Sequence, residues 1–110
     1  MATEMTVPDS MIDEILDENR VLVILPDDMQ VPLGPAEFVS DDDEGRRVSV
    51  TVLRTSRARL KHVPVTDRVL NGEEDLMKTL IGLRRDFDRE LSSDDVVTVV
   101  RFEAAKQDSA

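Results

Sequence analysis

The chain has no cysteine, tryptophan or tyrosine, and only three aromatic residues, Phe38, Phe87 and Phe102, occur among its 110 residues. Without cysteine there can be no disulfide, no thiolate zinc site and no cysteine nucleophile. The scarcity of aromatic residues predicts a core of valine, leucine, isoleucine and methionine. A chain of this length has room for one domain, residues 1–110, because two domains would each bury too little surface.

Long apolar segments are also missing. The longest unbroken apolar run, residues 21–25, is far shorter than the roughly 20 residues of a membrane span. The first residues lack the basic and then apolar pattern of a secretory signal. We therefore expect an intracellular or virion location and no membrane partner.

Known catalytic and ligand-binding motifs are absent. His62 is the only histidine and has no partner in a metal or general-base pattern, and the four glycines do not form a phosphate-binding loop. The acidic run Asp41, Asp42, Asp43, Glu44 lacks the alternating order of a calcium loop. The sequence predicts no catalytic residue, no metal and no cofactor, and hence a protein that is not an enzyme.

Lysine is scarce and aspartate is abundant. The chain has 15 Asp and 9 Glu against 11 Arg and 3 Lys, which gives a net charge of −10. This composition is typical of halophilic proteins, whose carboxylates hold water at high salt. A GC-rich genome favours the same residues, and both explanations stay open.

Hydrophobic periodicity predicts an α+β fold. A mixed or antiparallel sheet of three to five strands would be covered on one face by two helices, because two layers suffice to bury one core. Val48, Val50 and Val52 alternate with polar residues, and strict alternation predicts that Arg57 and Arg59 lie on the opposite face from these valines. The expected elements are a helix at 7–19, a strand at 21–25, an acidic loop at 26–45 with at most a short strand around Phe38, a strand or hairpin at 46–63, a helix at 73–91 capped by Asn71, a strand at 96–103 and a polar tail at 104–110.

Charge is unevenly distributed along the chain. Residues 1–45 contain 13 acids and one base, residues 46–70 contain one acid and seven bases, and residues 71–110 contain ten acids and six bases. The middle segment is therefore a basic arm within an acidic protein. The candidate partner-binding residues are the basic Arg54, Arg57, Arg59 and Lys61 and the acidic Asp41, Asp42, Asp43 and Glu44.

Three explanations compete for the basic arm. It could neutralise the acidic N-terminal half of the same molecule, or meet the acidic surface of a neighbouring copy in a closed ring. It could also contact nucleic acid, but a net charge of −10 and the lack of nearby aromatic residues make direct binding an unlikely use of the arm.

The order and length of the expected elements resemble the small ring-forming tail-terminator and head-to-tail completion proteins of tailed viruses. The features that carry this resemblance are the helix at 7–19, the strand at 21–25, the arm-like strands at 46–63, the helix at 73–91 and the closing strand at 96–103. The resemblance implies a structural protein that forms homo-oligomers and contacts other structural proteins, such as a component of a virion head–tail junction. The alternative is an acidic regulatory protein that mimics nucleic acid and inhibits a basic partner.

Overall fold

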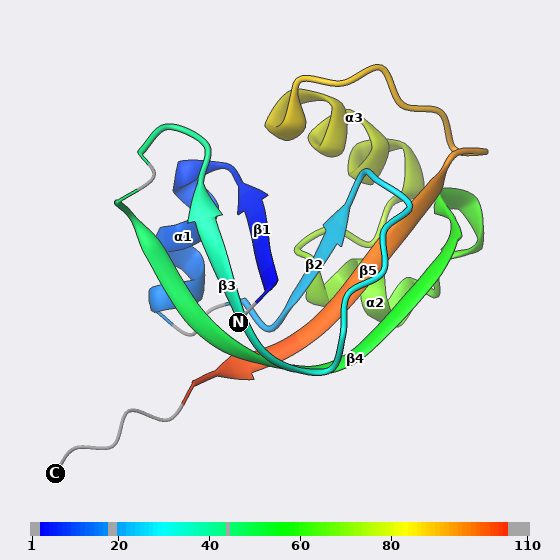
Figure 1. The fold of residues 1–110 in the computed structure, drawn as a ribbon. Coiled ribbons are helices and arrows are strands. Elements are labelled where there is room, and N and C mark those ends of the chain that lie inside the picture. Colours follow the sequence, from blue (N-terminus) through cyan, green and yellow to red (C-terminus); the bar gives the residue numbers. More distant parts are fainter. Residues whose placement is uncertain (1–2, 18–19, 44, 106–110) are drawn as a thin grey trace, which may run out of the picture.

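A computed structural model describes residues 3–17, 20–43 and 45–105, which form one five-stranded sheet and several short helices (Figure 1). None of the described helices has the length and apolar character needed to span a bilayer. The elements are β1 (Thr3–Val7), α1 (Asp9–Leu16), β2 (Leu22–Leu25), β3 (Gly34–Ser40), β4 (Arg47–Arg59), the 3-10 helix η1 (Leu60–His62), α2 (Val65–Leu70), α3 (Leu76–Phe87) and β5 (Val96–Ala104).

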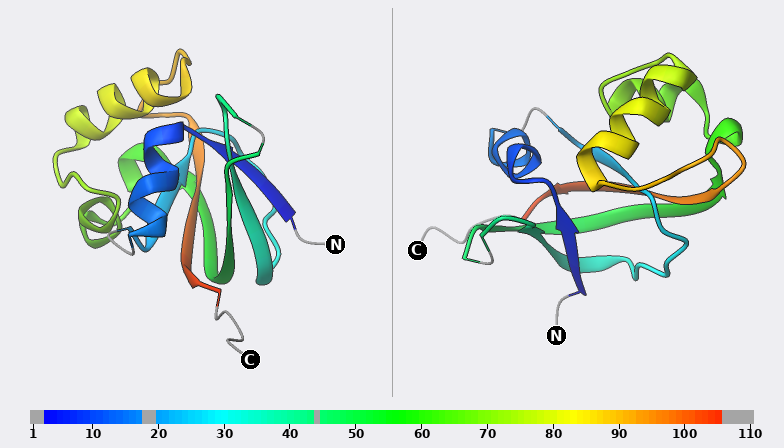
Figure 2. Two further views of the ribbon diagram at one scale, coloured as in Figure 1. Left: turned by 90° about the vertical axis from the view of Figure 1, so that its left-hand side faces the viewer. Right: turned by 90° about the horizontal axis from the view of Figure 1, so that it is seen from above.

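The sheet has the strand order β1-β3-β4-β5-β2 and curls into a half-barrel (Figures 1 and 2). β1 pairs with β3 in parallel, and the other neighbours are antiparallel. The longest strand, β4, pairs with β3 and β5 and so joins the two halves of the curled sheet. β1 and β2 are the two edge strands.

Two apolar clusters lie on opposite faces of β2 and β5. Val23 and Val100 belong to the first cluster, which α1 and the concave side of β1, β3 and β4 complete. Ile24 and Val99 belong to the second cluster, which η1 and α3 complete. The unbroken apolar sequence of β2 therefore reflects burial on both faces, although the strand lies at the edge of the sheet.

The predicted fold class is wrong, because the helices are not arranged on the sheet as expected. We expected two helices on one face, whereas α1 and α3 pack against opposite faces of β2 and β5. The sheet also begins with β1, within a segment that gave no strand signal, and the chain reaches α1 only at Asp9. The predicted end of the first helix, residues 18–19, and the tail residues 106–110 lie outside the described residues.

The acidic loop and the basic arm also differ from the prediction. Residues 34–40 form β3, an interior strand in which Phe38 is fully buried. Of the strand and the hairpin that the sequence left open for 46–63, the structure has one long strand at residues 47–59. A bulge at Leu53 shifts the register between Val52 and Arg54, so Arg57 lies on the same face as Val52, not the opposite face that alternation predicted.

The turn after α2 was assigned to the wrong helix. We expected Asn71 to cap the helix that follows, but it ends α2, and Asp75 caps α3 by accepting a hydrogen bond from the Lys78 N–H. The Glu73 N–H donates to the Arg68 carbonyl and the Gly72 N–H to the Val69 carbonyl, which is a Schellman motif. Gly72 has a φ of 109°, a conformation that favours glycine.

Candidate ligand-binding cleft

Two of the three predicted partner-binding arginines lie against carboxylates of their own chain. Arg54 pairs with Asp67 at 2.9 Å, and Arg57 pairs with Asp28 at 3.1 Å. Among the described carboxylates, none lies within ion-pair distance of Arg59, which is exposed at the end of β4.

Lys61 lies just beyond β4, where its Nζ pairs with Asp94 at 2.5 Å. This contact holds the pKa of Asp94 below the usual range for aspartate, first through the hydrogen bond from Lys61 and then through the charge of Lys61.

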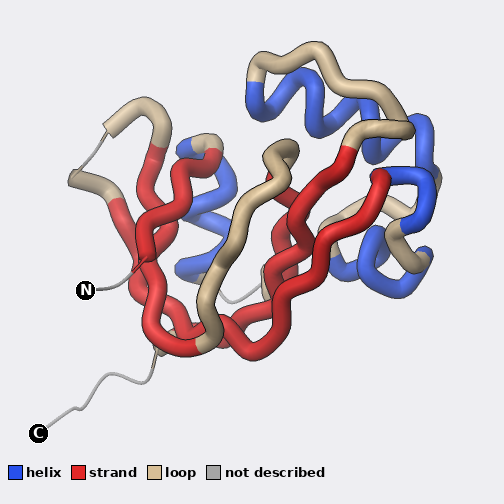
Figure 3. Tube along the Cα trace, turned by 45° about the vertical axis from the view of Figure 1, so that its right-hand side comes forward, coloured by secondary structure: helices blue, strands red, loops and turns tan. Residues whose placement is uncertain are grey.

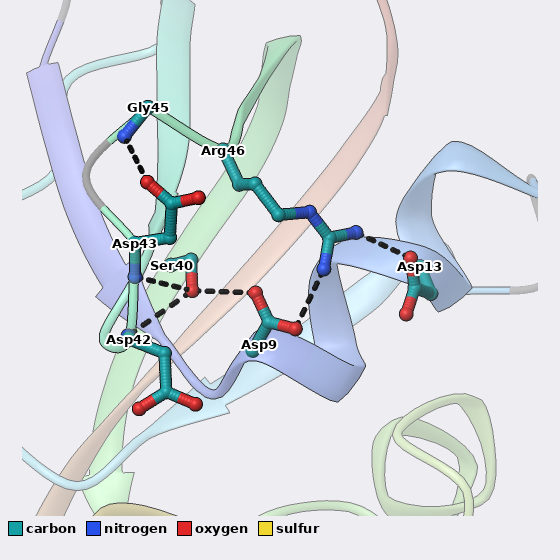
Figure 4. A network of polar contacts seen from close by, with 7 residues as sticks. All are labelled: Asp9, Asp13, Ser40, Asp42, Asp43, Gly45 and Arg46. Atoms are coloured by element: carbon teal, nitrogen blue, oxygen red, sulfur yellow. Dashed lines mark hydrogen bonds and ion pairs between the residues drawn. The ribbon is translucent and has the colours of Figure 1, made fainter.

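The predicted acidic site is a structured turn between β3 and β4 (Figure 4). The Ser40 hydroxyl donates to Asp9 at 2.7 Å and accepts hydrogen bonds from the backbone N–H groups of Asp42 at 3.1 Å and Asp43 at 3.2 Å. Asp41 is exposed in the same turn, and Glu44 lies outside the described residues. Within the part of the chain that the structure describes, no group of carboxylates is arranged to hold a metal.

The start of β4 is tied to the acidic N-terminal half. Arg46 pairs with Asp9 at 2.6 Å and also with Asp13, both on α1. Arg47 pairs with Glu4 of β1 at 3.0 Å and with Glu37 of β3 at 2.9 Å. Opposite charges therefore meet largely within one molecule, which removes the segregated surfaces on which the ring and the acidic inhibitor depended.

A cleft is lined by residues of α1, of α3 and of the turn that ends α2. Its volume is about 430 Å³, which falls within the range of small-ligand sites. Its walls combine apolar groups with charges of both signs. The lining residues are Met11 and Glu14 of α1, Arg20, the turn Asn71–Glu73, and Lys78, Thr79, Ile81, Gly82, Leu83, Arg85 and Asp86 of α3.

Arg20 and Asn71 form the fixed floor of this cleft. Arg20 Nε donates to Glu14 Oε2 at 2.7 Å, and Arg20 Nη1 donates to Asn71 Oδ1 at 2.8 Å. Asn71 Oδ1 also accepts the Ile24 N–H at 3.2 Å and so covers the free edge of β2. Only 14% of the Arg20 side chain is exposed, so these contacts hold it rigidly.

The remaining donors of the cleft are accessible. Asn71 Oδ1 accepts both hydrogen bonds, which leaves the Asn71 amide NH₂ without a protein acceptor among the described residues. Lys78 is exposed and has no described carboxylate at ion-pair distance, while Arg85 uses only its Nε in a contact with Asp86 at 3.1 Å. The cleft therefore offers donors to a ligand that carries oxygen or nitrogen acceptors.

The sequence prediction did not include these residues. Arg20 and Asn71 are 51 positions apart, so no local pattern joins them. One sequence signal did point to the cleft. Arg20 is the only basic residue among the first 45 residues, which also contain 13 acidic residues. The Asn71-Gly72 pair was noticed, but as the start of a helix.

Comparison with known proteins gives a fold but no close relative. No family model matches the chain, and no curated protein is significantly similar in sequence. The ASCH domain from Lactobacillus crispatus JV V101 superposes with a TM-score of 0.65 at 13% identity, covering 93% of this chain and 79% of that chain. Hypothetical protein PH0355 superposes with a TM-score of 0.70 at 17% identity, covering 96% and 100%.

These comparisons overturn the resemblance to tail-terminator proteins. The structural neighbours share the curled sheet and include an ASCH domain, and none of those reported is a virion protein. The expected role in virion assembly, with structural proteins as partners, is therefore wrong. The alternative, an acidic inhibitor that mimics nucleic acid, has no support from the fold either.

Proposed function

We propose that this chain is an RNA-binding domain of the ASCH type that acts through the cleft between α1 and α3. The observation that carries the proposal is the fold, which matches an ASCH domain over 93% of the chain. ASCH domains have a PUA-like fold, which points to RNA as the partner. The expectation that nucleic-acid binding would be unlikely is corrected on the same ground, because it rested mainly on the net charge.

The distribution of cations supports RNA contact at this cleft despite the charge of −10. Most arginines of β4 are neutralised by carboxylates, whereas Lys78 is not, and α3 has three bases against one acid. Phosphate binding depends on local cations, since Lys and Arg release counterions from the nucleic acid where they contact it. Arg20 and Asn71 would supply fixed donors to base edges beside these cations.

Fluorescence anisotropy with labelled single-stranded, hairpin and duplex RNA would test this function. We expect saturable binding that weakens as salt rises from about 50 to 200 mM, because few phosphate contacts still give a measurable salt slope. Replacing Lys78 and Arg85 together by Glu should weaken binding by about tenfold. No binding to any of these RNAs at low salt would overturn the proposal.

Arg59→Glu is the matched control for the cleft variant. Arg59 and Lys78 are both exposed, and neither has an ion pair with a described carboxylate. Arg59 lies at the end of β4, however, and does not line the cleft. This variant should keep RNA affinity within about twofold, apart from the general effect of charge. RNA recovered intact after incubation would agree with the prediction that the domain is not an enzyme.

A further inference from the structure

The second half of β4 has a strand on one side only. β3 pairs with β4 from Arg47 to Val52, whereas β5 pairs with β4 as far as Arg59. The bulge at Leu53 marks the point where the pairing with β3 ends. Beyond it, the described part of the chain provides no backbone partner for β4 on the β3 side.

The hydrogen-bonding pattern shows which backbone groups face this open edge. The Leu60 N–H donates to the Asp95 carbonyl at 3.0 Å, on the β5 side of the strand. Backbone groups alternate in direction along an extended strand, so those of Thr55, Arg57 and Arg59 point away from β5. The N–H and C=O groups of these three residues are therefore free to pair with another extended chain.

The segment that leads into β3 crosses the sheet instead of filling this position (Figure 3). The Thr98 hydroxyl donates to the Asp27 carbonyl at 2.5 Å and accepts the Met29 N–H at 3.0 Å, which fixes the segment over β5. Pro32 has no N–H to offer a neighbouring strand. An open groove of about 790 Å³ separates residues 28–32 from Thr55, Ser56 and Arg57 of β4.

The side chains along this edge favour an acidic partner. Arg54, Arg57 and Arg59 lie within six residues and are all exposed. Arg54 and Arg57 have a carboxylate partner, whereas none of the described carboxylates pairs with Arg59. Leu53 is 46% exposed, so an apolar contact is also available beside the charges. An added strand would place its side chains directly opposite these residues, where unlike charges attract.

We propose that the open edge of β4 binds an extended acidic peptide of a partner protein, which adds to the sheet as a sixth strand. Backbone hydrogen bonds to Thr55, Arg57 and Arg59 would supply affinity, and acidic side chains beside the arginines would supply selectivity. This inference does not depend on the RNA-binding role, because the edge and the cleft share no residue.

Titration of the full chain with a labelled peptide of about eight residues that alternates glutamate and valine would test the proposal. We expect saturable binding and amide shifts along residues 53–59 in NMR spectra. The same peptide with alternate backbone amides N-methylated keeps its charge but cannot pair, and should lose binding by about tenfold or more. Equal binding of the two peptides would overturn strand addition.

Two protein variants separate this site from the cleft. Replacing Arg57 and Arg59 by Glu should weaken peptide binding by about tenfold, while Lys78→Glu should leave it unchanged. RNA binding should be weakened by Lys78→Glu and little changed by the replacement of Arg57 and Arg59. A failure of peptide binding can therefore be distinguished from a failure of RNA binding. Displacement of the peptide by RNA, or dimerisation through the edge without peptide, would identify a different occupant and overturn the proposal.

Discussion

The two halves of β4 differ in both sequence and surroundings. Residues 47–52 pair with β3, and residues 50–52 pair with β5 as well. Val48, Val50 and Val52 are buried in a core that contains the Phe38 and Phe102 rings, whose centroids are 4.9 Å apart. Residues 54–59 have β5 alone as a neighbour and are mostly exposed. Valine favours a strand in the first half, whereas the second half has no valine and stays extended beside β5. The partners on either side therefore distinguish the half that builds the core from the half that is free to bind.

The largest expected difference between the halves is in hydrogen exchange. The amide hydrogens of Thr55 and Arg57 should exchange almost as in an unfolded chain, because no carbonyl of the described residues accepts them. The amides of residues 54 and 56, directed at β5, should be protected by at least about a hundredfold more. Exchange measured by NMR would check this, and equal protection of neighbouring amides would contradict the open edge.

Removing an aromatic ring should affect stability next most strongly. We expect Phe38→Ala to lower the free energy of unfolding by about 3–5 kcal/mol, since the ring is fully buried against Phe102. Phe38 lies on β3, opposite Val48 in the first half of β4, whereas Thr55→Ala in the second half of β4 should change the free energy of unfolding by about 0.5 kcal/mol or less. Urea denaturation followed by circular dichroism would measure both values.

The carboxylates that pair with the second half of β4 should differ from each other. Asp67 is 6% exposed, and Asp67→Asn should cost about 1–2 kcal/mol, a value reduced because Arg54 itself is half exposed. Asp28→Asn should cost about 0.5 kcal/mol or less, since both members of that pair are exposed. Similar losses from the two substitutions would show that burial of Asp67 adds nothing.

The smallest expected effect is a titration at the end of β4. Because Lys61 lowers the pKa of Asp94 in the folded state, this pair stabilises the protein above the pKa of the unfolded chain. The contribution disappears as the pH falls through the lower, folded-state pKa. Lys61→Met should raise the pKa of Asp94 towards its usual range in an NMR titration, and an unchanged value would exclude Lys61 as the cause.

Local sequence patterns predicted the elements whose buried residues form an apolar run or recur at a regular spacing. The apolar runs near β2 and β5 and the helical spacing near α3 were visible, because each depends on residues close together in sequence. β1 was not predicted, and β3 was expected as no more than a short strand around Phe38. The short β1 and the proline-containing β3 are formed by pairing with each other and with β4.

Local sequence patterns also could not predict which groups surround the basic arm. One extra residue at Leu53 reverses the side on which all later residues of β4 lie, and no motif marks it. The contact of Arg20 with Asn71 joins positions 51 residues apart, so the cleft exists only once the sheet has formed. The block of positive charge was real, but its neutralising carboxylates come from α1, β1, β3, α2 and the segment after β2.

β2 and β5 contribute side chains to both apolar clusters, so neither cluster can lose its strands while the other remains intact. The molecule should consequently unfold in a single cooperative step, with no populated state in which one half survives. Substitutions in either cluster would then shift the same transition, and thermal curves recorded by different probes should coincide.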